Sequence, residues 1–161
     1  MTQLHAPQTW AADYVSPIGR LRLRGTDNGL LSVAYVEDGG LSAAPLPPLA
    51  QRALDELEEY FRGTRQCFTV SMLPHGTPFQ RRVWDALRRV PFGMTTTYQA
   101  LADAIANPSS CRAVGSANMR NPLAIMIPCH RVLGKDGNLV GYAGGLWRKT
   151  WLLQHECARL L

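Results

Sequence analysis

The chain has 161 residues, of which 46% are hydrophobic; this is enough to bury a core and excludes a disordered or low-complexity protein. No apolar run approaches the roughly 18 residues that span a membrane, and the first residues lack the basic-then-apolar layout of a secretory signal, so we expect a soluble, cytoplasmic protein. The net charge of +5 is uneven, because residues 76–161 hold 11 basic and 4 acidic side chains, whereas residues 1–75 hold 6 and 8. Fifteen of the 17 cations are arginine, whose planar side chain suits phosphates and base edges. Charge alone leaves two interpretations open, a nucleic-acid-binding surface and an ordinary solvated basic surface.

The first half of the chain is typical of a small α/β domain. Short alternating segments bounded by turn residues predict strands over residues 14–18, 21–24 and 30–35, with a fourth over residues 67–72. Apolar residues at helical spacing predict a helix over residues 49–62, which Gly63 ends. We therefore expect residues 1–75 to form an α/β scaffold domain.

The second half, residues 76–161, is predicted to be a mostly helical domain. Thr77 and Gln80 form a capping-box pair in front of a helix over residues 78–90, in which Trp84 belongs to the buried stripe. A short helix over residues 98–105, a turn at 107–109 and a helix from the capping residue Ser110 to Asn118 have the layout of a helix-turn-helix. An ordinary helical corner fits the same pattern, so both interpretations remain open.

The remaining segments predict two strand elements and a last helix. The apolar run over residues 123–127 predicts a buried strand that leads to Cys129. Residues 132–133 and 139–142 flank a turn at residues 135–138 and predict a hairpin or wing. A helix over residues 146–160 completes the chain, and its expected inner stripe is Leu146, Leu153, Cys157 and Leu160.

The helix over residues 111–118 carries one long cation, Arg112, among small residues such as Ala113 and Gly115. Glycine within a helix costs about 1 kcal/mol relative to alanine, so its position indicates that another surface approaches the helix closely. That surface is either the protein core or a narrow DNA groove.

The four cysteines are Cys67, Cys111, Cys129 and Cys157, and they form neither a C-x-x-C pair nor a cluster with zinc-ligand spacing. We expect reduced thiols and no metal site, since only His5, Cys67 and His75 are available in the first domain. Cys129 is either buried core or a nucleophile whose pKa is lowered by the neighbouring His130 and Arg131. Neighbouring strand residues point to opposite faces, so direct contact with His130 needs a bend or a bridging water.

The pentad Pro128-Cys129-His130-Arg131-Val132 resembles the active-site signature of the methylated-DNA–protein-cysteine methyltransferases, the O6-alkylguanine-DNA alkyltransferases. Further matches at the family's spacing lie within residues 77–156, about half of the chain, and the Ser16-Pro17-Ile18-Gly19 segment adds a weak one. They are Arg112-Ala113-Val114-Gly115, Asn121-Pro122, Tyr98, Gly141-Tyr142-Ala143-Gly144-Gly145 and the segment from Trp151 to Glu156. The resemblance implies a ribonuclease H-like first domain and a winged helix-turn-helix second domain.

The resemblance also implies the reaction and its catalytic residues. The alkyl group of an O6-alkylguanine, and of an O4-alkylthymine, would move irreversibly to Cys129, so that each molecule acts once and needs no cofactor. His130 would take the thiol proton through a water, and Glu156 would stabilise the imidazolium. Asn121 would tie the helix end to the site, and Tyr98 would donate a proton to guanine N3 as the base leaves.

The implied partner is double-stranded DNA, bound by a monomer through the minor groove, with cooperativity along the DNA left open. The target base must be flipped out of the stack. The pocket for it would be formed by the Cys129 and Val132 carbonyls, Tyr142, the Ala143 amide and Gly144. DNA contacts would come from Arg112, which fills the gap left by the base, and from Ala113, Gly115, Gln99 and Lys135.

Three positions depart from well-known family members, namely Cys111, Asn118 and Ala143, and their effect on the pocket is open. Competing interpretations are a non-catalytic alkyltransferase-like damage sensor, a helix-turn-helix regulator and a cysteine hydrolase. The sensor proteins lack the nucleophile, so the presence of Cys129 argues against the first of these. Sequence-selective binding to undamaged DNA would favour the regulator, and nothing in the sequence indicates the cleft that a hydrolase needs.

Overall fold

The structure is a computed structural model that describes residues 6–41 and 44–157. The chain divides into two compact units, Met1–Pro74 and His75–Leu161. Within the described residues, every helix is too short or too polar to cross a bilayer. The architecture is mixed α/β.

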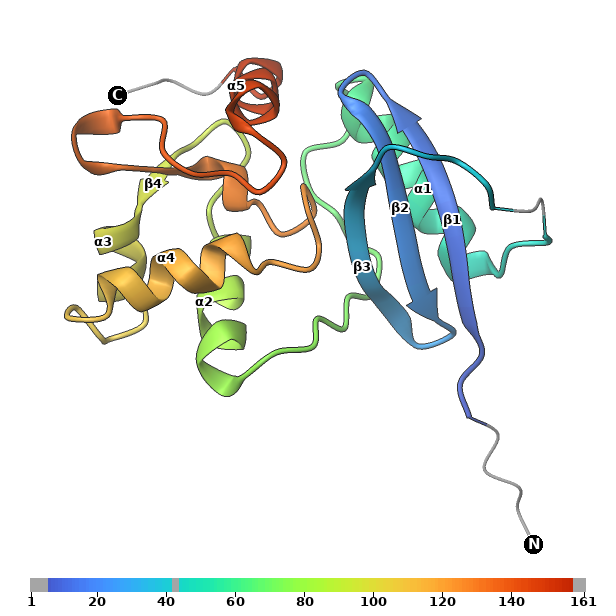
Figure 1. Cartoon of the computed structure of the whole chain (residues 1–161), viewed down its shortest axis with the longest axis horizontal. Coiled ribbons are helices and arrows are strands. Elements are labelled where there is room, and N and C mark those ends of the chain that lie inside the picture. The colour runs from blue at the N-terminus through green and yellow to red at the C-terminus, as the bar shows by residue number, and fades with distance from the viewer. Residues whose placement is uncertain (1–5, 42–43, 158–161) are drawn as a thin grey trace, which may run out of the picture. The chain divides into compact units, whose positions relative to one another are not determined.

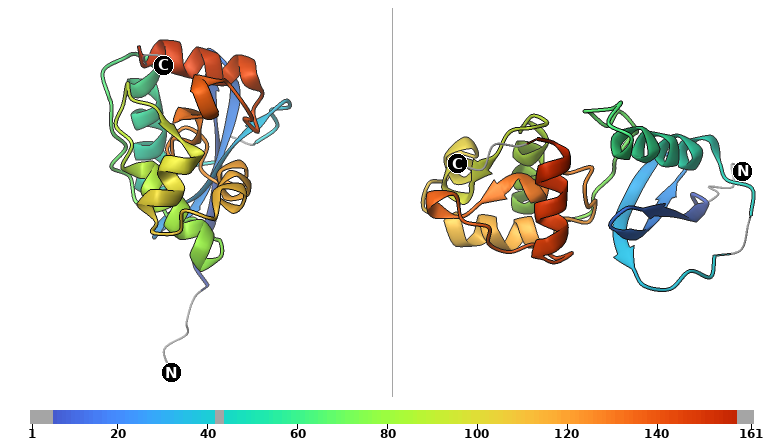
Figure 2. Two further views of the ribbon diagram at one scale, coloured as in Figure 1. Left: turned by 90° about the vertical axis from the view of Figure 1, so that its left-hand side faces the viewer. Right: turned by 90° about the horizontal axis from the view of Figure 1, so that it is seen from above.

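The first unit is a three-stranded antiparallel sheet with one helix packed against it (Figure 1). Strands β1 (Thr9–Ser16), β2 (Gly19–Thr26) and β3 (Gly29–Val36) follow one another through two tight turns. Helix α1 (Pro48–Phe61) covers one face of the sheet, as both views in Figure 2 show. Leu21, Leu23 and Leu57 are fully buried between the sheet and the helix. The three predicted strands and the helix are present, but the first strand runs over Thr9–Ser16 and not over residues 14–18.

The fourth strand predicted in this unit does not form. Residues 67–72 make a single bridge, between Leu30 and Met72, and otherwise run as irregular chain. The buried carboxylate of Glu56 on α1 accepts hydrogen bonds from the backbone amides of Thr69 and Val70, at 3.0 and 3.2 Å. These side-chain bonds satisfy the backbone groups that a sheet partner would otherwise pair.

The second unit contains three helices that pack on one another: α2 (Pro78–Arg88), α3 (Tyr98–Ala104) and α4 (Cys111–Met119). The predicted capping box between Thr77 and Gln80 is present in both directions. Trp84 is buried, and its Nε1 donates to the Ala117 carbonyl at 2.9 Å, which joins α2 to α4. Ser110 precedes α4 as expected, but its hydroxyl donates to the Asn107 carbonyl and does not cap the helix.

Two predictions for the chain after α4 are wrong. Residues 123–127 form no strand; they form a buried turn in which the Ile127 amide donates to the Leu123 carbonyl and Ile125 has a φ of 72°. The expected hairpin is absent from the described residues, because β5 (Val132–Leu133) pairs in parallel with β4 (Thr96–Thr97) and residues 139–142 are irregular. Two short 3-10 helices, η1 (Cys129–Arg131) and η2 (Lys135–Gly137), flank β5.

The last helix, α5 (Leu146–His155), is shorter than predicted, and Gly145 precedes it with a φ of 93°. Its expected inner stripe is largely wrong, because Leu146 and Cys157 are exposed. Leu153 is buried as expected, and Leu160 lies outside the described residues. The inner face of α5 is formed by Lys149, Leu152 and Leu153.

Candidate active site around Cys129

Cys129 lies at the start of a tight turn. Pro128, with φ −81° and ψ 62°, has the backbone conformation of an inverse γ-turn, and the Cys129 amide donates across it to the Ile127 carbonyl at 2.8 Å. Cys129, His130 and Arg131 follow on one 3-10 turn and are all buried. Cys129 and His130 therefore do not lie on opposite faces of a strand, as expected, but follow one another in a bend of the chain.

Asn121 shapes the segment in front of this turn. Its amide nitrogen donates to the Ile127 carbonyl at 2.7 Å and to the Leu123 carbonyl at 3.4 Å, while its oxygen accepts from the Leu123 amide at 2.9 Å. Asn121 does not cap α4, because the C-cap of that helix is Arg120. Asn121 thus holds the buried loop over residues 123–127 in the shape that delivers Cys129.

The carboxylate of Glu156 binds two neighbours of Cys129 at once. Its Oε1 lies 2.7 Å from His130 Nε2 and 2.9 Å from an Arg131 terminal nitrogen, and its Oε2 accepts from Arg131 Nε at 2.8 Å. Another Arg131 nitrogen donates to the Val90 carbonyl at 2.7 Å. Because Nε2 of His130 faces the carboxylate, the other ring nitrogen is the one left for chemistry: Nδ1 is buried and has no hydrogen-bond partner among the described residues.

The charges around His130 favour a neutral imidazole beside an ionised carboxylate. Burial acts to raise the pKa of Glu156, but hydrogen bonds and charge from His130 and Arg131 outweigh it and hold that pKa far below its ordinary value. Burial lowers the pKa of His130, which Glu156 partly counters and the Arg131 charge reinforces. A neutral imidazole with a free nitrogen can accept a proton, and Glu156 can stabilise the cation that results.

The thiol itself is in its protonated form at rest. Burial raises the pKa of Cys129, and a hydrogen bond from Asn121 and the charge of Lys149 only partly offset this rise. The expectation of a lowered thiol pKa is therefore wrong, because the low polarity of a fully buried position outweighs the nearby cation. The thiolate has to be formed during the reaction.

Lys149 and Tyr98 both bind the Val140 carbonyl. The Lys149 ammonium, fully buried, donates to the carbonyls of Val132 at 2.5 Å, Val140 at 2.9 Å and Gly141 at 3.1 Å. The Tyr98 hydroxyl donates to the same Val140 carbonyl at 3.3 Å. Tyr98 is the first residue of α3, which Thr97 caps from β4 directly beside β5. Burial raises the pKa of Tyr98, so its hydroxyl keeps its proton near neutral pH.

The other predicted pocket residues lie on the two segments that Lys149 joins. Val132 in β5 and Tyr142 are buried, whereas Ala143 is exposed and Gly144 is half-buried. The Gly145 amide donates to the Tyr142 carbonyl, and Arg148 donates to the Gly144 carbonyl at 3.0 Å. The Cys129 carbonyl accepts from the Val132 amide and from the Asn118 amide at 3.5 Å. Both Cys129 and Val132 thus have carbonyls that already accept hydrogen bonds from the protein.

The predicted DNA-contacting residues lie on exposed surfaces of α3, α4 and η2 and are not part of the cluster around Cys129. Arg112 and Ala113 are exposed in the first turn of α4, and Lys135 is exposed in η2. Gln99 is exposed on α3, and its amide donates to Asp103 and to the Pro108 carbonyl. A Cβ on Gly115 would meet only the Tyr98 ring, at 3.9 Å. Packing within the protein therefore does not require a glycine there.

The positions that depart from the family pattern differ in their surroundings. Cys111 is half-buried at the start of α4, and Ala143 is exposed. Asn118 is buried, and its Oδ1 has no hydrogen-bond partner among the described residues. Asn118 is thus a polar residue in the immediate surroundings of Cys129.

Sequence reasoning missed one residue of this cluster, Lys149, and it named Arg131 only as a charge beside Cys129, not as a partner of Glu156. Arg131 stands next to His130 in the chain, and only the 3-10 turn brings it to Glu156. Lys149 lies seven residues before Glu156, a spacing that places both on one face of a helix. That spacing was the available signal for Lys149.

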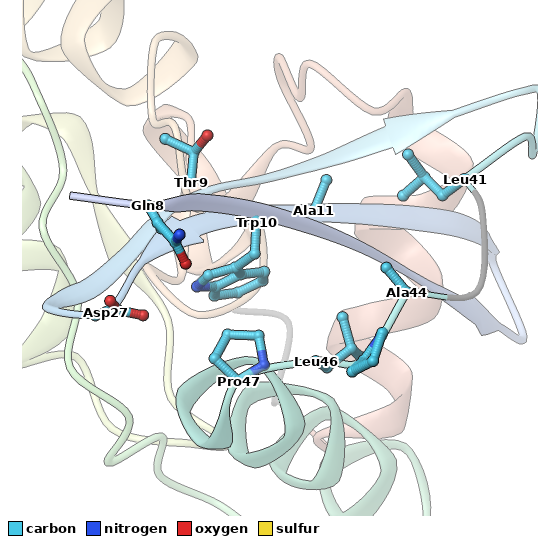
Figure 3. Close-up of a pocket in the computed structure, with 10 residues that line it drawn as sticks. Gln8, Thr9, Trp10, Ala11, Asp27, Leu41, Ala44, Leu46 and Pro47 are labelled. Atoms are coloured by element: carbon cyan, nitrogen blue, oxygen red, sulfur yellow. The ribbon is translucent and has the colours of Figure 1, made fainter. Parts of the chain in front are cut away.

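The structure has a further hollow in the first unit, of about 580 Å³, between β1 and the segment before α1 (Figure 3). Trp10, Leu41 and Pro47 line it together with Asp27. The Trp10 indole nitrogen already donates to the Thr26 carbonyl at 3.1 Å. No group of three or more metal-ligating side chains exists among the described residues, here or elsewhere; His5 lies outside them.

Comparison with known proteins places the chain in one family. Residues 78–158 match the family described as the DNA-binding domain of 6-O-methylguanine DNA methyltransferase. The methylated-DNA–protein-cysteine methyltransferase of Methanosarcina acetivorans is 43% identical over 152 residues, which cover 90% of this chain and 96% of that protein. The crystal structure of the Mycobacterium tuberculosis O6-methylguanine methyltransferase has a TM-score of 0.83 at 41% identity and 93% coverage of both chains. A structure of the M. tuberculosis protein in complex with DNA has a TM-score of 0.82 at 43% identity, covering 90% of this chain and 91% of that one. The chain belongs to the methylated-DNA–protein-cysteine methyltransferase family.

Proposed function

We propose that this protein repairs DNA by transferring the alkyl group of an O6-alkylguanine, and of an O4-alkylthymine, to its own Cys129. The observation that carries the proposal is the buried Glu156–His130 pair. His130 follows Cys129 on one 3-10 turn, and its Nδ1 has no partner in the part of the chain that the structure describes. A base of this kind is needed because the thiol is protonated at rest. Family membership supports the same reaction.

The chemistry of the transfer fits a cysteine. His130 Nδ1 takes the thiol proton through a water, and Glu156 stabilises the imidazolium. The sulfur then forms a bond to the alkyl carbon while the bond from that carbon to O6 breaks. The electron pair stays on the guanine, which receives a proton at N3 from the Tyr98 hydroxyl. The thiol proton is then on His130 and Tyr98 is a phenolate, so the balance closes when the imidazolium proton returns to Tyr98 through water.

The thioether that forms does not hydrolyse, so each molecule acts once. The reaction needs no cofactor, because the cysteine is both catalyst and acceptor. The Tyr98 hydroxyl donates to the Val140 carbonyl in the structure, so it would have to break this bond before it gives its proton to the base. The Asn121 bonds keep the Cys129 turn in place throughout.

The target atom lies inside the duplex, so the nucleotide must be flipped out. We propose that α4 enters the minor groove, where Ala113 and Gly115 allow close approach and exposed Arg112 fills the gap. Minor-groove contacts read little sequence, which suits repair at any guanine. Gln99, Lys135 and the basic balance of residues 76–161 would bind phosphates. Tyr142, Ala143, Gly144 and the carbonyls of Cys129 and Val132 would receive the base, since each carbonyl has a second lone pair.

We also propose a fold class for each domain, a cellular location and an oligomeric state. The antiparallel sheet with one helix supports a ribonuclease H-like class for the first domain, residues 1–75, which serves as a scaffold. The α3–α4 pair supports a winged helix-turn-helix class for the second, residues 76–161. We propose that the protein acts in the cytoplasm as a monomer on double-stranded DNA, away from membranes.

Incubation with an O6-methylguanine duplex tests this function. We expect one methyl group per protein, and repeated turnover by one molecule contradicts the proposal. Tight binding of the damaged duplex without transfer would instead identify a non-catalytic damage sensor, an interpretation that the buried nucleophile Cys129 disfavours.

A further inference from the structure

We propose that Asn118 is a specificity-determining residue for the transfer reaction: its buried side-chain oxygen accepts a hydrogen bond from the exocyclic amino group of the flipped guanine. This inference rests on the proposed function and deepens it. Asn118 is one of the positions at which the chain departs from well-known family members, and the amino group is the feature of the substrate that it reads.

The side-chain oxygen of Asn118 is buried without a hydrogen-bond partner. Asn118 lies near the end of α4 and is only 2% exposed, and its Oδ1 has no partner in the described parts of the chain. Its Nδ2 donates to the Cys129 carbonyl at 3.5 Å; the reversed amide would set two oxygen atoms against each other. A buried acceptor without a partner is costly and rare, so its position calls for a donor that the substrate brings.

Asn118 neighbours both Cys129 and Tyr98. The bond from Nδ2 joins it to the Cys129 carbonyl. Gly115 lies three residues earlier on α4 and therefore on the same face of the helix, and a Cβ on Gly115 would lie 3.9 Å from the Tyr98 ring. Burial raises the pKa of Tyr98, and a hydrogen bond from Asn118 partly offsets this rise. The Asn118 amide thus lies beside the group proposed to protonate the base.

The guanine edge that meets this part of the site has an acceptor and a donor next to each other, N3 and the amino group on C2. In the proposed reaction Tyr98 gives its proton to N3, so the amino group comes to lie beside Tyr98. An acceptor that neighbours both Tyr98 and the Cys129 carbonyl is placed to receive it. Oδ1 of Asn118 is closed to solvent in the structure, so we expect the base to reach it in the movement that frees the Tyr98 hydroxyl from the Val140 carbonyl.

The two carbonyls that are proposed to receive the base already accept hydrogen bonds from the protein. The Cys129 carbonyl accepts from the Val132 amide and from Asn118. The Val132 carbonyl accepts from Lys149 at 2.5 Å. Oδ1 of Asn118 accepts from no described residue, so it has more hydrogen-bonding capacity left than either carbonyl.

The proposed hydrogen bond separates the two lesions of the proposed reaction. Thymine has no amino group at the corresponding edge and presents only the acceptor O2. With an O4-alkylthymine in the pocket, the Asn118 oxygen would still lack a donor. Asn118 therefore favours O6-alkylguanine over O4-alkylthymine.

Two duplexes that differ by the amino group alone test the proposal. One carries O6-methylguanine, and the other carries O6-methylhypoxanthine, which keeps the methyl group, O6 and N3 but has hydrogen in place of the amino group. The measured quantity is the ratio of the two second-order rate constants for single-turnover transfer. Asn118→Leu removes the oxygen at similar side-chain size. Met119→Leu, at the exposed next position of α4, is the matched control.

We expect the wild-type protein to prefer O6-methylguanine by at least tenfold, the order of magnitude of one hydrogen bond. Asn118→Leu should reduce this preference by about tenfold, whereas Met119→Leu should leave it unchanged. A purely structural role of Asn118 would slow transfer from both duplexes by the same factor. An unchanged preference in folded Asn118→Leu therefore overturns the proposal.

The wild-type protein gives a second test in case Asn118→Leu does not fold. Equal wild-type rates on the two duplexes overturn the proposal without any variant. Asn118→Ser, whose hydroxyl is too short to reach the same place, then replaces Asn118→Leu and should show the same loss of preference. Absence of wild-type transfer from both duplexes refutes the proposed function and this inference with it, whereas transfer with a preference that does not depend on Asn118 refutes this inference alone.

Discussion

Replacing Glu156 with glutamine removes one charge from the centre of the site and leaves its shape. The carboxylate accepts from His130 Nε2 at 2.7 Å and from two Arg131 nitrogens at 2.8 and 2.9 Å. An amide keeps one accepting oxygen, and its nitrogen then faces a donor of either His130 or Arg131. Arg131, which is only 6% exposed, loses its counterion.

Breaking a buried ion pair by removing one partner costs about 3–5 kcal/mol, out of a typical free energy of unfolding of about 5–15 kcal/mol. Arg131 keeps its bond to the Val90 carbonyl, so we expect Glu156→Gln to lose about 3 kcal/mol. For a chain of this length, this lowers Tm by roughly 6–12 °C. Loss of the carboxylate beside His130 should also slow transfer by roughly 10²-fold.

The stability lost in Glu156→Gln should depend on pH in a characteristic way. A carboxyl group whose pKa is depressed on folding stabilises the protein above its unfolded pKa, and this contribution is lost as pH falls below it. The difference in stability between wild type and Glu156→Gln should therefore be full at pH 7 and shrink below the ordinary value of 4.5. Denaturant unfolding at a series of pH values measures it.

Glu59→Gln is the matched control. Glu59 is 45% exposed on α1 and pairs with Arg65 at 2.6 Å, and such surface pairs contribute at most about 1 kcal/mol. Wild-type stability of Glu156→Gln at pH 7, or a difference from wild type that stays constant down to pH 3, would refute the account of the buried group.

Two further substitutions test the DNA-facing helix. Arg112→Ala should leave Tm unchanged, because the side chain is exposed, and should slow transfer from duplex DNA; an unchanged single-turnover rate on duplex argues against a wedge role. Gly115→Ala should raise the free energy of unfolding by up to about 1 kcal/mol, because a Cβ meets only the Tyr98 ring. The same change should weaken duplex binding in an anisotropy titration, and equal affinity would show that α4 does not approach DNA closely at this position.

The elements with strong local signals could be predicted from the sequence. The helices α1 and α2 have apolar stripes and defined ends, and the Thr77–Gln80 capping box forms as expected. The strands of the first unit pair through tight turns, and β2 places Leu21 and Leu23 two residues apart on its buried face. In these elements each residue interacts mainly with neighbours that the pattern itself specifies.

The apolar run over residues 123–127 predicts a strand that does not form, because hydrophobicity indicates burial and not backbone conformation. All of its residues except half-buried Ala124 are buried, as in a buried strand. The Asn121 side chain, however, satisfies three backbone groups that a strand would pair elsewhere. Ile125 adopts a positive φ, which is rare for a β-branched residue. Neither feature has a signature in hydrophobic periodicity.

Within the site, proximity along the chain pointed to Cys129 and His130 but not to their chemistry. Neighbouring charge in the sequence predicts a lowered thiol pKa, whereas burial of Cys129 raises it. The partners of Glu156 and the three carbonyls around Lys149 come from segments far apart in sequence. Such contacts depend on how α5 packs against η1 and β5, which local patterns do not specify.

The central claim is that the sulfur of Cys129 accepts the alkyl group. Peptide mass spectrometry after incubation with an O6-methylguanine duplex tests it most directly, with Cys129→Ser as the control that binds the duplex and accepts no methyl group. We predict one added methyl group, on the peptide that contains Cys129, and none on those with Cys67, Cys111 or Cys157. An unmodified Cys129 peptide after the lesion has disappeared, or a methyl group on another cysteine, would contradict the account.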